Sequence, residues 1–115
     1  MKVVIAGSRQ FNNYELLSSK LDNFFKNHTD IEIVSGAARG ADQLGERYAR
    51  EKGYKLTRFP ADWDRHGKSA GYIRNQEMAN YATHAVIFWD GQSRGTAHMI
   101  TLCDRHKLKF RVVKF

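Results

Sequence analysis

The sequence has little that would place the protein outside a cell or across a membrane. Its 115 residues include a single cysteine, Cys103, so no disulfide can form within the chain, and the reducing cytoplasm is the expected location. Apolar runs such as 85–89 are strand-sized, and none approaches the roughly 18 residues of a membrane span. The run Met1–Ala6 is also too short for a signal peptide. We therefore expect a cytoplasmic protein with no membrane partner.

Proline is scarce as well, and its scarcity bears on domain organisation. Pro60 is the only proline, and the chain has no Pro-rich linker, internal repeat or low-complexity stretch. Hydrophobic residues make up 42% of the sequence, which is enough for one core. We expect residues 1–115 to form a single domain.

Acidic residues are outnumbered, with 12 against 19 lysines and arginines and a net charge of +7. Such a balance favours an anionic partner, which can be a nucleotide, a nucleic acid or another phosphorylated compound.

Short apolar runs alternate with helical patterns along the whole chain. The expected strands are Lys2–Ala6, Ile31–Ser35, Tyr54–Phe59, Ala85–Trp89 and Lys109–Val113. The expected helices are Asn13–Lys26, Ala41–Lys52, Ser69–Tyr81 and Gly95–His106, and the segment Ala61–Lys68 is expected to be an irregular loop. Asn12 or Asn13 can cap the first helix, and Gly53 suits the left-handed end of the second.

Strict alternation of strands and helices predicts an α/β, Rossmann-like three-layer sandwich with a five-stranded parallel sheet. Right-handed crossovers give the order 3-2-1-4-5 as the simplest arrangement. In such sheets the ligand crevice lies beyond the carboxyl ends of the strands, where the strand order reverses. The relevant loops are 7–9, 35–42 and 90–96.

Glycines and arginines concentrate at this edge of the sheet. Seven of the nine glycines fall at or near it, and Arg9, Arg39, Arg94 and Arg74 are expected to converge there. Helix N-termini and guanidinium groups both favour phosphate, so the edge is expected to bind an anion. The expected ligand-binding residues are Gly7, Ser8, Arg9, Ser35, Gly36, Ala37, Arg39, Gly40, Asp42, Lys68, Arg74, Asn75, Asp90, Gly91, Ser93, Arg94, Gly95 and Thr96.

These motifs are similar to those of a known superfamily. Gly7-Ser8-Arg9, the stretch 35–42 (SGAARGAD) and Arg74-Asn75 resemble three signatures of the DNA-processing protein A fold. The stretch 91–96 (GQSRGT) resembles the Gly-rich motif of the cytokinin-activating phosphoribohydrolases. The whole chain is therefore identified as resembling the SMF/DprA–LOG (SLOG) superfamily, and in particular its small YspA-like members from bacteria and phages. The resemblance implies nucleotide binding, for sensing as often as for catalysis, and a homodimer or larger assembly.

The resemblance to the hydrolases breaks at one position. Those enzymes place a catalytic glutamate three residues after the threonine of the motif, where this chain has Met99. Asp42, Glu77 and Asp90 are among the acids expected near the pocket edge. Asp90 and Glu77 are alternative candidates for acid–base catalysis, and so is Asp42, whose ordinary role is to cap its helix or hold Arg39. No metal site and no required cofactor are expected, because no second cluster of His or Cys residues accompanies the set on 98–106.

These observations lead to three hypotheses for the function. The leading hypothesis is a module that binds a nucleotide or nucleotide-derived ligand without hydrolysing it. The alternatives are an N-glycosidic hydrolase and a single-stranded DNA binder. Trp63 and Trp89 are candidates for stacking on a base. Replacing Arg39 or Arg74 with alanine is expected to abolish ligand binding and leave thermal stability nearly unchanged.

Overall fold

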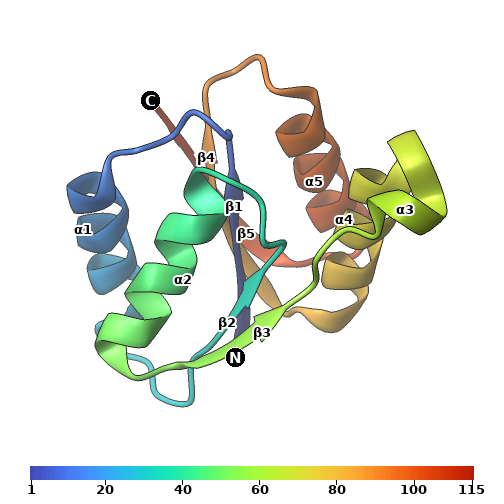
Figure 1. Ribbon diagram of the computed structural model, residues 1–115. Coiled ribbons are helices and arrows are strands. Elements are labelled where there is room, and N and C mark those ends of the chain that lie inside the picture. Colours follow the sequence, from blue (N-terminus) through green and yellow to red (C-terminus); the bar gives the residue numbers. More distant parts are fainter.

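A computed structural model describes all residues, 1–115, and contains five strands in one parallel sheet (Figure 1). The strands are β1 (Lys2–Gly7), β2 (Glu32–Ser35), β3 (Lys55–Arg58), β4 (His84–Trp89) and β5 (Lys109–Lys114). Their order is β3-β2-β1-β4-β5 and every pair is parallel, as the alternation predicts. The order reverses between β1 and β4, so the crevice lies above these two strands.

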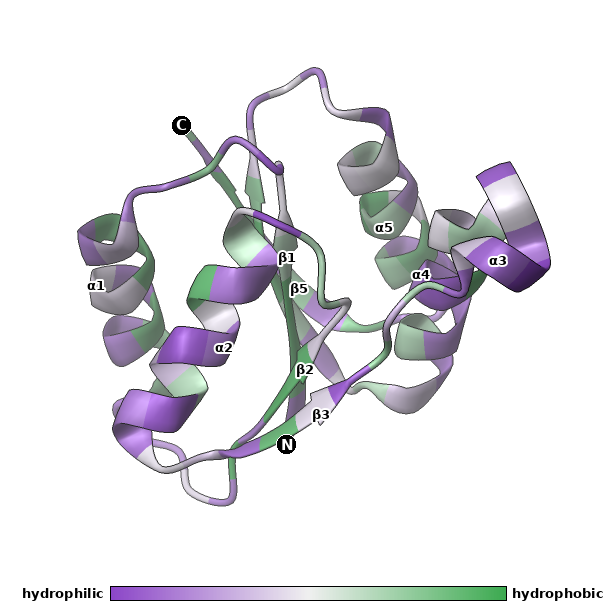
Figure 2. Ribbon diagram, in the orientation of Figure 1, coloured by the Kyte–Doolittle hydropathy of each residue, from purple (hydrophilic) through white to green (hydrophobic).

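Helices cover both faces of the sheet because the strand residues are apolar on both sides. Helices α1 (Tyr14–Phe25) and α2 (Ala41–Lys52) lie on one face, and α4 (Ala70–Tyr81) and α5 (Arg94–Arg105) lie on the other (Figure 1). Along β1, Val3 and Ile5 belong to the first core, while Val4 and Ala6 belong to the second. Figure 2 shows this central strand as apolar and the outer helix surfaces as polar. Burial on both faces is typical of parallel sheets.

Local capping signals set the ends of two helices. The Asn13 side chain accepts a hydrogen bond from the backbone N–H of Leu16 (3.0 Å) at the start of α1. At the end of α2, Gly53 has a φ of 73°, the left-handed conformation expected of it.

One segment differs from the sequence prediction. Residues expected to be an irregular loop contain the short helix α3 (Trp63–His66), followed by a 3-10 turn over Gly67–Ser69. The cause is a cap, since the Asp62 carboxylate accepts a hydrogen bond from the Arg65 N–H (3.1 Å). The consequence is a small lobe beside α4 (Figure 1), and its first helical residue, Trp63, lines the crevice.

No helix of the structure has both the length and the apolar character needed to cross a membrane.

Candidate functional site

A cavity of about 560 Å³ opens at the carboxyl ends of β1 and β4, where the sheet order reverses. We call it the main cavity. Its volume falls within the usual range for small-molecule sites, roughly 300–1,000 Å³. Eleven of the expected residues line it: Gly7, Ser8, Arg9, Asp42, Lys68, Arg74, Asn75, Asp90, Ser93, Gly95 and Thr96.

A second hollow of about 300 Å³ adjoins the main cavity on the side of β2 and β3. We call it the side hollow. It shares Arg9, Ala38, Trp63 and Arg74 with the main cavity, and its other lining residues are Gly36, Ala37, Arg39, Pro60 and Ala61. Three expected ligand residues, Gly36, Ala37 and Arg39, therefore lie here. Four others line neither space: Ser35, Gly40, Gly91 and Arg94.

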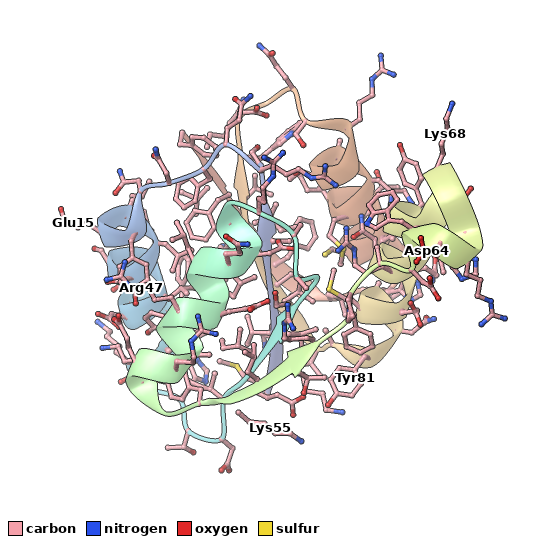
Figure 3. The ribbon with its side chains drawn as sticks, in the orientation of Figure 1. Glu15, Arg47, Lys55, Asp64, Lys68 and Tyr81 are labelled. Atoms are coloured by element: carbon pink, nitrogen blue, oxygen red, sulfur yellow. The ribbon has the colours of Figure 1, made fainter.

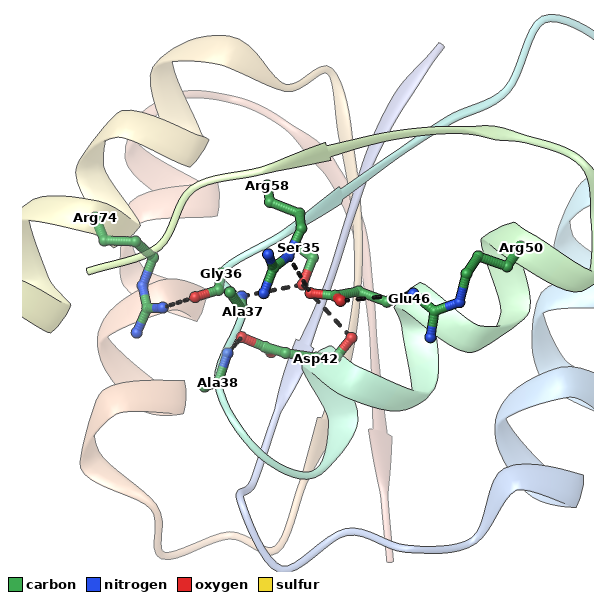
Figure 4. A network of polar contacts seen from close by, with 9 residues as sticks. All are labelled: Ser35, Gly36, Ala37, Ala38, Asp42, Glu46, Arg50, Arg58 and Arg74. Atoms are coloured by element: carbon green, nitrogen blue, oxygen red, sulfur yellow. Dashed lines mark hydrogen bonds and ion pairs between the residues drawn. The ribbon is translucent and has the colours of Figure 1, made fainter. Parts of the chain in front are cut away.

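The loop after β2 is held by side chains beneath it. The Ser35 hydroxyl accepts a hydrogen bond from the Ala37 N–H (3.0 Å), and the Asp42 carboxylate accepts one from the Ala38 N–H (3.1 Å). Ser35 in turn donates to the buried carboxylate of Glu46 (2.7 Å), as Figure 4 shows. The Ser35 hydroxyl is therefore committed to this internal network. Of the two roles expected of Asp42, capping its helix or holding Arg39, the second is wrong, because Asp42 accepts a hydrogen bond from the Ala38 N–H and forms no ion pair with Arg39.

Two glycines at this edge allow close packing of the chain against itself. Gly40 has a φ of 75°, and a Cβ atom there would lie 2.4 Å from the Ser8 carbonyl oxygen. A Cβ atom on Gly7 would lie 2.1 Å from the carbonyl oxygen of Phe88. Both contacts are shorter than van der Waals contacts with backbone atoms, so each position requires glycine whether or not a ligand is bound.

Arg74 is the most unusual residue of the site. It is 8% exposed, its Nε donates to the Asn75 side chain (3.0 Å), and its Nη1 donates to the Gly36 carbonyl oxygen. The remaining nitrogen, Nη2, has no hydrogen-bond partner in the protein. Since no fully buried side-chain nitrogen or oxygen lacks a partner, Nη2 is at least partly accessible, and Arg74 lines both hollows. An anion in the cavity can therefore accept hydrogen bonds from a guanidinium that is already fixed in place.

These contacts change one expectation about Arg74. A buried guanidinium that ties α4 to the loop after β2 contributes to stability, so its loss cannot leave thermal stability unchanged. Arg39 is exposed and makes no side-chain hydrogen bond or ion pair, so the expectation is unaltered for that residue.

Asp42 is the buried carboxyl of the main cavity. It is 5% exposed, and burial raises its pKa to about 6, although the Ala38 N–H and the nearby Arg74 favour the ionised form. Burial also lowers the pKa of Arg74. A titratable pair of this kind in a cavity is typical of functional sites.

The first turn of α5 forms another wall of the main cavity. Its Ser93 cap position makes no side-chain capping bond, and the first turn contains no acidic residue. The leading N–H groups of a helix have no partner within the helix, and its positive dipole end favours anions. Ser93, Gly95 and Thr96 all line the cavity here, and the Ser93 and Thr96 hydroxyls lie 3.0 Å apart.

Asp90 and Glu77, two of the acids named as catalytic candidates, are poorly suited to proton donation in the main cavity. One oxygen of Asp90, Oδ1, accepts hydrogen bonds from the N–H groups of Gln92 (2.9 Å) and Ser93 (2.8 Å), which hold the pKa of Asp90 below its ordinary value. Glu77 is exposed on α4 and lines neither hollow, so its expected place near the pocket is wrong. Met99, at the position of the hydrolase glutamate, lies in the cavity wall.

Sequence reasoning missed the apolar part of the lining. Ala6, Met78 and Met99 contribute to the wall next to the second core, and Gln10, Ala38, Gly71, Tyr72 and Gln92 complete the main cavity. Trp63, a stacking candidate, borders both hollows and is 50% exposed. Trp89 lines neither, because its ring N–H donates to the Ser93 carbonyl oxygen (3.1 Å). The capping Asp62 was the signal that could have placed Trp63 on a helix.

The cations of the site form no direct ion pair, although the carboxyl of Asp42 lies near Arg74. Five ion pairs occur in the protein, and all join residues of α1, α2, β2 or β3. None includes Arg9, Arg39, Lys68, Arg74 or Arg94. Figure 3 shows the contrast between Arg47, on the surface of α2 among these pairs, and Lys68, which extends from the lobe beside α4. Unpaired positive charge is thus available at the edge of the main cavity.

Comparison with solved structures supports the fold. DNA processing protein A from Streptococcus pneumoniae matches 96% of this chain with a TM-score of 0.77 and 18% identity. The protein of the same name from Helicobacter pylori, whose structure is described for its single-stranded DNA binding mode, matches 97% with a TM-score of 0.71 and 18% identity. This chain spans 49% of the first protein and 64% of the second, so it corresponds to part of each.

Comparison of sequences identifies the family. The Gene 61 protein of Mycobacterium phage D29 is 35% identical over 121 residues, which cover 99% of this chain and 95% of that protein. Residues 1–66 match the model of the YspA, cpYpsA-related SLOG family. With the fold, the glycine- and arginine-rich edge and these matches together, the chain belongs to the YspA, cpYpsA-related SLOG family.

Proposed function

We propose that this protein binds a nucleotide or nucleotide-derived ligand in the main cavity and holds it without hydrolysis. The observation that carries the proposal is Arg74, a buried guanidinium that lines both hollows and whose Nη2 has no partner in the protein and is not fully buried. Desolvating a charge is costly, and the cost is offset when an anion occupies the same space.

The lining supports one orientation of the ligand. The first turn of α5 offers N–H groups and the Ser93 and Thr96 hydroxyls to a phosphate. Asp90 lines the cavity, and its second carboxylate oxygen can accept hydrogen bonds from ribose hydroxyls. Met78, Met99 and Trp63 offer apolar and aromatic surface to a base. Asn75 positions Arg74 and the first turn of α5, because its side-chain amide is bonded to Arg74 and to the Gly95 carbonyl oxygen.

The proposal favours binding over turnover because the acid with the raised pKa, Asp42, is 5% exposed and accepts a hydrogen bond from the Ala38 N–H, which commits it to holding the loop after β2. Asp90 has a lowered pKa, and Met99 occupies the place of the hydrolase glutamate. A hydrolase would need a proton donor near the glycosidic bond.

The test is a calorimetric titration with nucleoside monophosphates of all four bases, paired with mass spectrometry of any small molecule released on denaturation. We expect Arg9→Ala to weaken binding at least tenfold, because Arg9 borders both hollows without an internal ion pair. Arg111→Ala is the matched control, since it removes the same charge from the exposed edge strand β5 and should leave affinity unchanged. An empty titration together with no released ligand would overturn the proposal, and release of free base during incubation would replace binding with hydrolysis.

Single-stranded DNA is the second candidate ligand. The specific observation in its favour is the fold shared with the Helicobacter pylori protein, together with the net charge of +7. Binding should then weaken with salt, with a slope of about −0.7 per phosphate neutralised in a plot of log affinity against log salt concentration. Fluorescence anisotropy of a labelled oligonucleotide measures this slope, and a flat response would exclude DNA as the ligand.

A further inference from the structure

The side hollow is a separate space with its own chemistry. It adjoins the main cavity through four shared residues, and Trp63 stands at the boundary with half of its surface exposed. The two hollows measure about 560 and 300 Å³. A ligand that occupies the larger one can therefore extend past Arg9 and Arg74 into the smaller one.

The charges that line the side hollow are of one sign. Arg9, Arg39 and Arg74 are three of its nine lining residues, and none of the nine is acidic. The main cavity differs, because Asp42 and Asp90 lie in its wall. None of the three arginines takes part in an ion pair. Burial is the main cause of the lowered pKa of Arg74; Asp42 opposes the shift, and Arg9 is close enough to add to it. Mutual repulsion of this kind is relieved by an anion placed between the cations.

The backbone of the side hollow is fixed before any ligand arrives. Ala37 adopts a φ of 62°, a conformation that costs free energy for a residue with a side chain. Its N–H is bonded to Ser35, and the next N–H is bonded to Asp42. At Gly36 a Cβ atom would lie 2.5 Å from Nη1 of Arg74, so glycine is needed there to admit the guanidinium. The loop 36–38 is therefore held by hydrogen bonds to Ser35 and Asp42, and Arg74 is bonded to its Gly36 carbonyl oxygen.

We propose that the side hollow is a second anion subsite, and that the ligand carries two phosphate groups separated by a nucleoside, as a linear dinucleotide does. One phosphate lies at the first turn of α5, the nucleoside fills the main cavity, and the second phosphate lies among Arg9, Arg39 and Arg74. The inference rests on the proposed function, since the main cavity must hold the nucleoside. The same chemistry occurs in a free dinucleotide and in a stretch of single-stranded DNA.

The first test uses inorganic phosphate, which depends on no base. Amide resonances are followed by NMR while phosphate is titrated at constant ionic strength. We expect two sets of shifts, one at Gly95 and Thr96 and the other at Ala38 and Arg39. In Arg39→Ala the second set, followed at Ala38, should disappear and the first should remain, whereas Arg111→Ala should keep both.

The second test compares ligands with one and two phosphates. Nucleoside monophosphates and 5′-phosphorylated dinucleotides of each base are titrated calorimetrically against wild type and Arg39→Ala. We expect the best dinucleotide to bind at least tenfold more tightly than the best mononucleotide, and this gain to vanish in Arg39→Ala. An octanucleotide titrated in parallel separates the two sources, because a free dinucleotide ligand should bind at least as tightly as the longer strand.

The outcomes of these tests distinguish the second anion subsite from nucleotide binding in the main cavity. Phosphate shifts at Gly95 and Thr96 alone, with equal affinity for one and two phosphates, would overturn the second subsite and leave nucleotide binding intact. Shifts at neither place, with no nucleotide bound, would overturn both.

Discussion

Replacing Gly95 with alanine should change the stability of the fold and the affinity for the ligand in opposite directions. Gly95 lies in the first turn of α5 and lines the main cavity, and a Cβ atom there would meet nothing within 4 Å. Because its φ is not positive, alanine fits the backbone and lowers the entropy of the unfolded chain. We expect Gly95→Ala to stabilise the fold by about 0.5 kcal/mol, which corresponds to a rise in Tm of about 2–4 °C.

The same methyl group should interfere with a ligand. It would project from the helix turn whose N–H groups are proposed to hold a phosphate, and a phosphate needs close approach to the backbone there. We expect nucleotide affinity to fall at least tenfold, which is about 1.4 kcal/mol. The variant should therefore be more stable than wild type and bind less well.

Gly40→Ala is the matched control. It inserts a methyl group 2.4 Å from the Ser8 carbonyl oxygen and 2.6 Å from the Arg9 carbonyl oxygen, at a φ of 75° and at a position that itself lines neither hollow. Backbone strain of this kind costs roughly 1–3 kcal/mol before the clash is counted, so the fold should lose stability. Urea denaturation measures both variants, and calorimetry with the best-binding nucleoside monophosphate measures affinity. If Gly95→Ala bound as tightly as wild type, the placement of phosphate at α5 would be refuted, and if it were destabilised, the argument from its open surroundings and backbone conformation would be wrong.

Two further outcomes concern the buried charges. The pKa of Asp42 is about 6 in the folded protein and near 4 in an unfolded chain, so its protonated form favours folding; the stability that it contributes below pH 4 is lost as the pH rises through 6. Asp42→Asn should abolish this dependence. The difference in unfolding free energy between wild type and variant, measured by urea denaturation, should therefore change by about 2–3 kcal/mol between pH 4 and pH 7. A difference that stays constant with pH would contradict this reasoning. Arg74→Met should lower stability by about 1–3 kcal/mol, because it leaves the Gly36 carbonyl oxygen without its donor, and an unchanged Tm would show that these contacts contribute nothing.

The position of the site could be read from the sequence because it follows from rules of chain topology. Alternating strands and helices with right-handed crossovers fix the strand order, and the order fixes the edge where a ligand can enter. Residues that directly follow β1 and β4, such as Ser8 and Asp90, therefore had to line the crevice.

Individual roles could not be assigned in this way, because they depend on which side chains meet across the fold. Ser35 carries the hydroxyl expected of a phosphate ligand, yet the distance to Glu46 commits it to an internal bond. Gly40 matches a phosphate-binding glycine in type, but its conformation serves contact with the backbone of Ser8. A motif specifies residue types and spacing, whereas hydrogen-bond partners are set by packing.

The sequence by itself determined the layers, the strand order and the edge at which positive charge gathers, since periodicity and crossover handedness are local properties of the chain. Only the tertiary structure decided that Arg74 is buried with one nitrogen left free, and that a second hollow opens beside it. Both features arise where α3, α4 and the loop after β2 converge, and no local pattern encodes the distances between three separate segments.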